Sequence, residues 1–193
     1  MSSLSLESSA ATPPAPSRRL GLYDTWWTVA TAALAACLAL SACAWVSLHL
    51  HTDHALHTAA LFVHLASLVL GFGAVLVADY HGLLWISGRC SLRDTLDSTA
   101  RLHAPIWTGL AGLIVSGVIL HPDLTSPLTR TKLALVLILT LNGLQAGLLN
   151  RRMAQHASTP VPPRFLAWGA TTALVSQVCW WGAVVIGFHN SQH

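Results

Sequence analysis

The stretch LHTAALFVHLASLVLGFGAVLVADYHGLLW, residues 56–85, decides the fold of this chain. It contains one carboxylate, Asp79, and no lysine or arginine. A helix that crosses a bilayer needs about 20 predominantly apolar residues. The stretch is long enough and apolar enough to meet that requirement, so it predicts a transmembrane helix.

The composition of the whole chain agrees with this prediction. Of its 193 residues, 53% are hydrophobic and only 9% are charged, whereas a soluble domain carries about 25% charged residues. The chain has too few charges to cover its own apolar surface, so we expect an integral membrane protein surrounded by lipid. The net charge of +3 reflects the basic loops and gives no indication of nucleic-acid binding.

Four further apolar runs follow the same pattern, at Trp26–Leu50, Leu102–Leu120, Leu133–Leu149 and Phe165–Phe188. No alternating strand pattern occurs, and unsatisfied backbone groups are costly in lipid, so the runs should be helical. We therefore predict an all-α integral membrane bundle of five transmembrane helices over residues 23–190. Residues 1–22, rich in Ser, Pro and Ala, are typical of a disordered cytoplasmic tail.

The placement of the basic residues predicts the orientation of the bundle. Eight of the ten basic residues precede the first run or lie in the second and fourth connections, and only Arg130 and Lys132 lie at the other end. Because cytoplasmic loops are enriched in Lys and Arg, we expect a cytoplasmic N-terminus and an extracytoplasmic C-terminus in the plasma or inner membrane. The pair Arg18–Arg19 also suits an export signal, but the apolar run that follows is longer than the core of a cleavable signal.

Small and polar residues inside the runs predict how the helices pack. Glycine, alanine, serine and threonine let helix backbones approach closely in lipid. We expect contacts at stripes formed by Gly71, Ala78 and Gly82, by Thr108, Gly112 and Ser116, and by Gly143 and Gly147. We also expect a hydrogen bond between Asn142 and Gln177, with a substrate contact as the alternative. Asp79 should form an ion pair with Arg89, Arg93 or Arg101, with a role in proton relay as the alternative.

Histidines gather in the predicted outer loop HLHTDHALH, residues 49–57. Neutral imidazole is a good ligand for zinc or copper. His51, His54, His57 and His121 are therefore candidate metal ligands, with a hydrated loop that holds no metal as the alternative. His54 and His57 should share the first turn of the second helix.

His64 lies inside the second predicted span, where an ionisable residue is uncommon and indicates function by default. His64 could be an axial ligand of haem b, it could relay a metal ion, or it could form a hydrogen bond to a neighbouring helix. Gly71 lies two turns further along on the same side and could leave space for a macrocycle. His49 or His189 could supply a second ligand from the outer ends of the first and fifth spans.

A second pair, His81 and His103, is expected at one depth near the cytoplasmic boundary. The two rings could ligate a second haem, or they could form interfacial hydrogen bonds. The sequence does not distinguish between these two roles.

Two stretches resemble the copper-resistance protein D family and the haem-binding membrane protoporphyrinogen oxidases. They are ALFVHLASLVLGFGAVLV, residues 60–77, and SPLTRTKLALVLILTLNGLQAGLLNRR, residues 126–152. The resemblance covers about residues 56–152. It implies that His64 is an iron ligand and that Lys132 is an outer basic residue near a haem propionate or a substrate.

Three functions follow as hypotheses. The first is a b-type haem protein in electron transfer or a cofactor-dependent oxidation, with an unidentified redox partner. The second is transport or handling of copper, zinc or another divalent metal, and the third is a non-catalytic membrane subunit that holds a partner. No phosphate-binding glycine loop, nucleophile elbow or His-Glu-x-x-His motif occurs, which argues against hydrolysis or ATP-driven chemistry, and whether the chain is an enzyme stays open.

Overall fold

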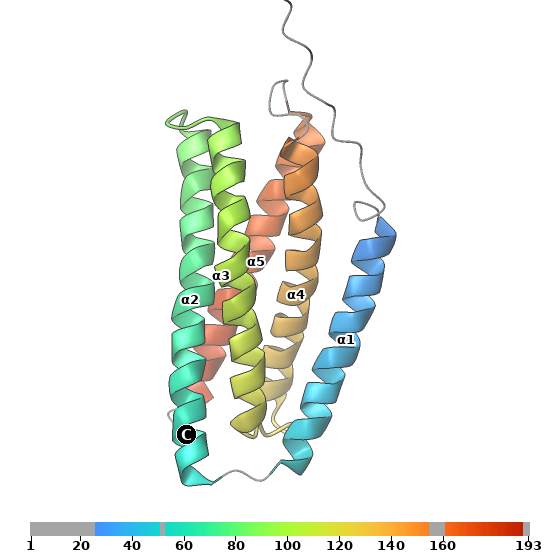
Figure 1. Cartoon of the computed structure of the whole chain (residues 1–193), viewed down its shortest axis with the longest axis vertical. Helices are drawn as coiled ribbons and strands as arrows, with labels where there is room; N and C mark the ends of the chain where they lie inside the picture. Colours follow the sequence, from blue (N-terminus) through green and yellow to red (C-terminus); the bar gives the residue numbers. More distant parts are fainter. Residues whose placement is uncertain (1–25, 51–52, 155–160, 191–193) are drawn as a thin grey trace, which may run out of the picture.

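The computed structural model describes residues 26–50, 53–154 and 161–190, and all of its regular structure in these ranges is helical. The helices are α1 (Trp26–His49), α2 (His54–Ile86), α3 (Leu92–Ile119), α4 (Pro127–Ala154) and α5 (Pro163–Asn190). Each is long and apolar enough to cross a membrane, which confirms the prediction of an all-α chain with five long apolar helices. Neighbours in the chain run antiparallel, so α1 begins and α5 ends at opposite ends of the bundle (Figure 1). The predicted tail, residues 1–22, lies outside the described residues.

α3 begins earlier than its predicted span, because a capping residue stabilises its N-terminus. α3 begins at Leu92, ten residues before the predicted start at Leu102. The Ser91 hydroxyl accepts the Asp94 N–H at 3.1 Å, and it donates to the Asp94 carboxylate at 2.6 Å. These bonds satisfy groups at the helix N-terminus that have no partner within the helix. Charged first turns can therefore be helical although hydropathy excludes them from the span.

α2 and α3 form the most extensive helix pair, and glycine allows their close approach. A Cβ on Gly71 would lie 3.2 Å from the Cα of Gly109. One turn further, a Cβ on Gly112 would collide with the Ser67 side chain. The predicted contacts at Gly71 and Gly112 are confirmed, whereas a Cβ on Gly82 or Gly147 would meet open space.

An aromatic cluster joins α2 to α5 at the level of this crossing. Trp180 is 2% exposed, and its ring stacks on Phe72 with 5.5 Å between centroids. Trp181 meets the same Phe72 ring edge-on at 5.0 Å. Leu110 of α3 and Leu139 of α4 belong to the same buried cluster. Helices α2–α5 therefore share one core.

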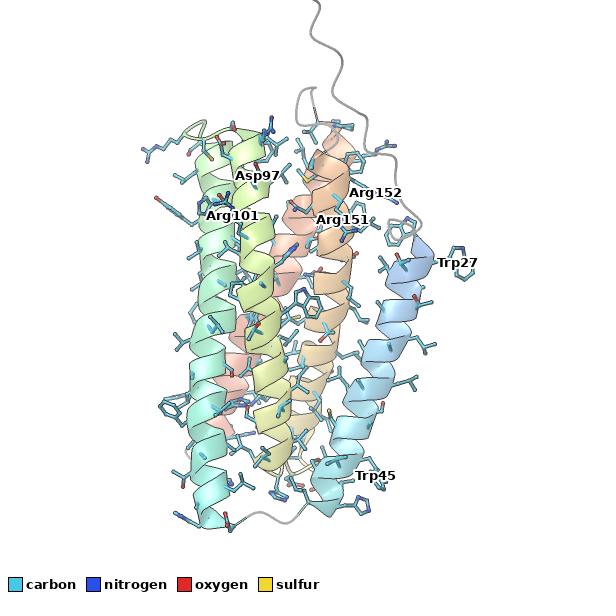
Figure 2. The ribbon with its side chains drawn as sticks, in the orientation of Figure 1. Trp27, Trp45, Asp97, Arg101, Arg151 and Arg152 are labelled. Carbon is cyan, nitrogen blue, oxygen red and sulfur yellow. The ribbon has the colours of Figure 1, made fainter. Side chains whose placement is uncertain are left out.

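α1 lies at the side of this core, against α3 and α4 (Figure 1). Its only buried residue is Ser47. Near its N-terminus, Trp26 stacks on Trp168 of α5 at 5.6 Å, and the Arg152 guanidinium lies 5.5 Å from the Trp26 ring and 6.0 Å from the Trp168 ring. This end of the bundle also carries Asp97, Arg101 and Arg151, whereas Trp45 marks the other end (Figure 2).

Two predicted polar contacts are wrong. Asn142 donates to the Thr172 carbonyl at 2.9 Å and accepts from Gln145 at 2.9 Å, rather than bonding to Gln177. Gln177 instead donates to Asp79 at 2.5 Å and accepts from Trp181 Nε1 at 3.0 Å. The amide thereby occupies the carboxylate that was expected to pair with Arg89, Arg93 or Arg101. The angular position of each side chain about its helix axis decides these partners.

Candidate functional site

His64 joins α2 to α3 inside the bundle. It lies ten residues after the start of α2, about 15 Å along the helix axis. Its side chain is half-buried, and Nδ1 lies 2.9 Å from the Ser116 hydroxyl oxygen. Ser116 is 1% exposed, so this hydrogen bond forms within the packed α2–α3 interface.

The hydrogen bonds around Ser116 fix the roles of the two ring nitrogens. The Ser116 hydroxyl lies 2.5 Å from the Gly112 carbonyl, which can only accept, so the single hydroxyl proton is directed there. The Ser116 oxygen must therefore accept from His64, and Nδ1 carries the proton. The Leu113 carbonyl also interacts with the ring and is likewise only an acceptor. In the neutral imidazole this tautomer leaves the lone pair on Nε2.

The surroundings of His64 combine a cation with glycine surfaces. Lys132 of α4 lies close enough to His64 for their charges to interact. A Cβ on Gly117 would lie 3.8 Å from His64 Cε1, and a Cβ on Gly187 would lie 3.6 Å from Lys132 Nζ. The cluster His64, Ser116, Gly117, Lys132 and Gly187 thus draws on α2, α3, α4 and α5, and we call it the His64 cluster.

Lys132 has no anionic partner in the part of the chain that the structure describes. It is half-buried in an apolar helix. A charge inside a span is costly unless it pairs with another group or reaches water. The His64 cluster therefore combines a lone pair on Nε2 with a cation that could bind an anion.

The two histidines proposed as second ligands differ in position. His49 ends α1, where Nδ1 lies 2.8 Å from the Trp45 carbonyl and the ring packs on Trp45 at 4.4 Å. His189 lies nine residues after Trp180, and His64 lies eight residues before Phe72, the residue on which Trp180 stacks. Because α2 and α5 run antiparallel, these offsets of about 13 and 12 Å place His189 at a depth similar to that of His64.

His81 and His103 lie at different depths, contrary to expectation. The His81 carbonyl accepts from Thr95 at 3.4 Å, and His103 is eight residues further along α3, about 12 Å along the axis. The His81 Nδ1 lies 2.8 Å from the Val77 carbonyl of its own helix, whereas His103 faces the charge of Arg151. The early start of α3 causes the offset, since the predicted start at Leu102 had put both residues at a helix end.

The outer histidines are spread over the surface. His54 and His57 are exposed in the first turn of α2, as predicted, with Asp53 as the N-cap. The His121 ring bonds to the Leu50 carbonyl, and His51 lies outside the described residues. Within residues 26–50, 53–154 and 161–190, no three His, Cys, Asp or Glu side chains come together as metal ligands. A metal site at these histidines stays a prediction.

Ser116 is the site residue that the sequence did not identify. It was expected only as a small residue in a helix contact. Its spacing of four residues from Gly112, on a stripe that faces the helix bearing His64, is the signal that could have indicated a histidine partner.

Comparison with known protein families, with curated proteins and with solved structures finds no match to this chain.

Proposed function

We propose that this chain is a membrane redox protein that binds a b-type haem, with His64 Nε2 as an iron ligand. The observation that supports the proposal is the Nδ1–H donated to Ser116. A histidine that binds a metal through one ring nitrogen typically donates a hydrogen bond from its other ring N–H to an oxygen acceptor. This hydrogen bond fixes the tautomer and the orientation of the ring. His64 has this arrangement of a ring N–H and an oxygen acceptor.

The residues around His64 suit the other parts of a haem. The Lys132 ammonium group would bind a propionate carboxylate and would gain the anionic partner that it lacks in the described residues. Gly117 and Gly187 leave the helix surfaces beside His64 and Lys132 without side chains. When bound, haem iron would supply one-electron chemistry. The residues of the chain would orient the imidazole and exclude water.

His189 is the favoured second ligand, because its depth on α5 is similar to that of His64 on α2. His49 is less suitable, because α1 packs on α3 and α4 and its ring already contacts Trp45. Under this assignment, loss of either histidine should change the absorption bands of the haem, and loss of His64 also removes the ring that Ser116 orients.

The proposal includes the orientation of the bundle in the membrane, which we infer from the positions of its arginines. Arg89, Arg93, Arg101, Arg151, Arg152 and Arg164 occupy one end of the bundle, the end at which α1 begins. The positive-inside rule places this end in the cytoplasm and the His64 cluster in the outer half of the membrane. The proposed location is the plasma or inner membrane.

The test is the absorption spectrum of the full chain, purified in detergent from haem-replete cells. We expect a Soret band in the oxidised protein and sharp α and β bands after reduction with dithionite. The variant His64→Ala should lose these bands. The matched control is His57→Ala, on the same helix but exposed at its outer end, which should keep them.

Metal analysis of the same preparation separates the alternatives. Iron in proportion to the Soret band supports haem. Copper or zinc without a Soret band would favour a metal-handling protein instead. A protein that lacks both, and whose spectrum is the same in the wild type and in His64→Ala, contradicts the proposal.

A further inference from the structure

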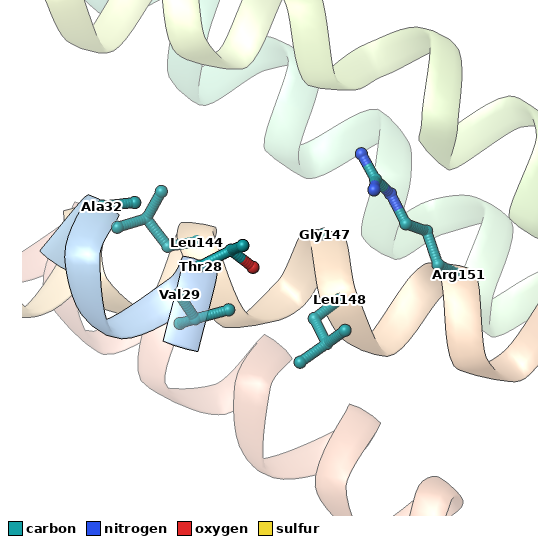
Figure 3. A pocket seen from close by; sticks show the side chains of 7 residues that line it. All are labelled: Thr28, Val29, Ala32, Leu144, Gly147, Leu148 and Arg151. Carbon is teal, nitrogen blue, oxygen red and sulfur yellow. The ribbon is translucent and has the colours of Figure 1, made fainter. Parts of the chain in front are cut away.

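A pocket with a volume of about 250 Å³ lies between α1 and α4 (Figure 3). Its lining residues on α4 begin at Leu144, whereas Lys132 of the His64 cluster lies near the start of that helix. Its apolar walls are Val29 and Ala32 of α1 and Leu144 and Leu148 of α4. The polar residues that line it are Thr28 and Arg151. The pocket is therefore apolar along its length and polar towards the end where α1 begins.

Several arginines lie at the end of the bundle towards which the pocket is polar, together with one labelled carboxylate, Asp97 (Figure 2). Arg151 is exposed and interacts electrostatically with His103 of α3. Arg152, the next residue, lies over the rings of Trp26 and Trp168. Arg101 lies near the same end (Figure 2). An anionic group would be attracted to this region, and the exposed Arg151 is the cation that lines the pocket itself.

We propose that this pocket binds one anionic phospholipid. The phosphate contacts the Arg151 guanidinium and the Thr28 hydroxyl, and an acyl chain lies along Val29, Ala32, Leu144 and Leu148. Guanidinium groups match phosphate oxygens in geometry and charge, and basic pockets between transmembrane helices bind anionic head groups. The position of α1 at the side of the bundle opens the pocket to surrounding lipid.

Gly147 provides a way to close the pocket without changing its charge. It lines the pocket, and a Cβ placed on it would meet nothing within 4 Å. A leucine at this position would extend into the space that the acyl chain occupies. Gly82 of α2 is the matched control, because a Cβ there also meets nothing within 4 Å.

The experiment is native mass spectrometry of the full chain in detergent, titrated with phosphatidylglycerol or with phosphatidylcholine of the same acyl chains. We expect one tightly retained phosphatidylglycerol per chain and weaker retention of phosphatidylcholine. Arg151→Gln should weaken phosphatidylglycerol binding about five- to tenfold, as expected for the loss of one arginine–phosphate contact. Arg89→Gln, which removes the same charge from the exposed turn after α2, should leave it unchanged.

Two further arms test the acyl chain and the source of the phosphate. Gly147→Leu should abolish the preference for phosphatidylglycerol, whereas Gly82→Leu should keep it. Excess inorganic phosphate should fail to displace the lipid, because it lacks the acyl chain. The proposal is overturned by equal retention of the two lipids, by equal effects of Arg151→Gln and Arg89→Gln, or by full displacement with inorganic phosphate.

Discussion

Gly71 of α2 and Gly109 of α3 cross with their backbones in contact, so Gly109 has no space for a Cβ and Gly71 has very little. A Cβ on Gly109 would lie 2.7 Å from the Ser67 carbonyl oxygen and would also collide with the backbone of Gly71. A Cβ on Gly71 would additionally meet the Trp180 ring at 3.1 Å. This crossing fixes the separation of α2 and α3, and with it the distance between His64 and Ser116.

Gly109→Ala should destabilise the bundle by about 1–3 kcal/mol, the usual range for overpacking a tight contact. The methyl group meets backbone atoms that cannot rotate away, so the helices must separate. The measurement is unfolding in detergent with increasing SDS, followed by circular dichroism. Gly73→Ala is the control, since a Cβ on Gly73 meets nothing within 4 Å. Equal stability of the two variants would contradict the crossing.

Ser116→Ala should weaken haem binding about 10- to 100-fold, the typical effect of removing a group that orients a metal ligand. The imidazole would lose the acceptor that holds the proton on Nδ1. Haem titration of the purified apoprotein measures the affinity. Ser41→Ala is the control, because the Ser41 hydroxyl bonds only to the Cys37 carbonyl of its own helix, at 2.8 Å. If both serine variants bind haem like the wild type, Ser116 does not orient the ligand.

Gln177→Leu should cost about 0.5–1.5 kcal/mol, the usual net contribution of a hydrogen bond, because Asp79 is only half-buried and Trp181 is exposed. The change removes the donor to Asp79 and the acceptor of Trp181 Nε1. Asp79→Asn should cost less, because an amide oxygen still accepts from Gln177. SDS unfolding measures both variants, and a larger loss in Asp79→Asn than in Gln177→Leu would contradict this account.

Arg152→Gln should loosen the N-terminal end of α1, with a loss of about 0.5–2 kcal/mol for the cation–π contacts. The guanidinium is the cation that lies over both Trp26 and Trp168. A spin label at the exposed Thr31 should become more mobile in electron paramagnetic resonance. Arg164→Gln is the control, because Arg164 lies over Phe165 of its own helix at 5.1 Å and does not contact α1 there. Unchanged mobility in Arg152→Gln would show that other contacts hold α1.

Cysteine labelling tests the orientation. The exposed positions Ser87, after α2, and Thr125, before α4, lie at opposite ends of the bundle. In a chain whose native cysteines are replaced by alanine, a membrane-impermeant maleimide on intact cells should label Thr125→Cys and not Ser87→Cys. Disruption of the cells should expose both. The reverse pattern would place the arginine-rich end outside.

The sequence predicted the number of helices because lipid demands long apolar segments, and length and composition alone report them. It did not predict where α3 begins, because hydropathy excludes the charged first turns around Arg93 and Asp97, which the Ser91 cap and the burial of Leu96 stabilise. It also paired Asn142 with Gln177 from depth alone. The rotation of α4 directs Asn142 to the Thr172 carbonyl instead, and depth does not determine that rotation. His64 was identified because an imidazole in a span is rare, but its partner Ser116 required the α2–α3 register set by Gly71 and Gly109.

The length of α2 has its own effect at the membrane surface. Its 33 residues extend about 50 Å, whereas the hydrocarbon layer is about 30 Å thick. A helix that is longer than the lipid layer is thick can tilt, or its ends can protrude from the lipid. The first turn of α2, with His54 and His57, is one of these ends. A thicker bilayer would cover more of that turn and a thinner one would expose more of it. The hydrogen bond between His64 and Ser116 joins two packed helices and would keep its length in both bilayers.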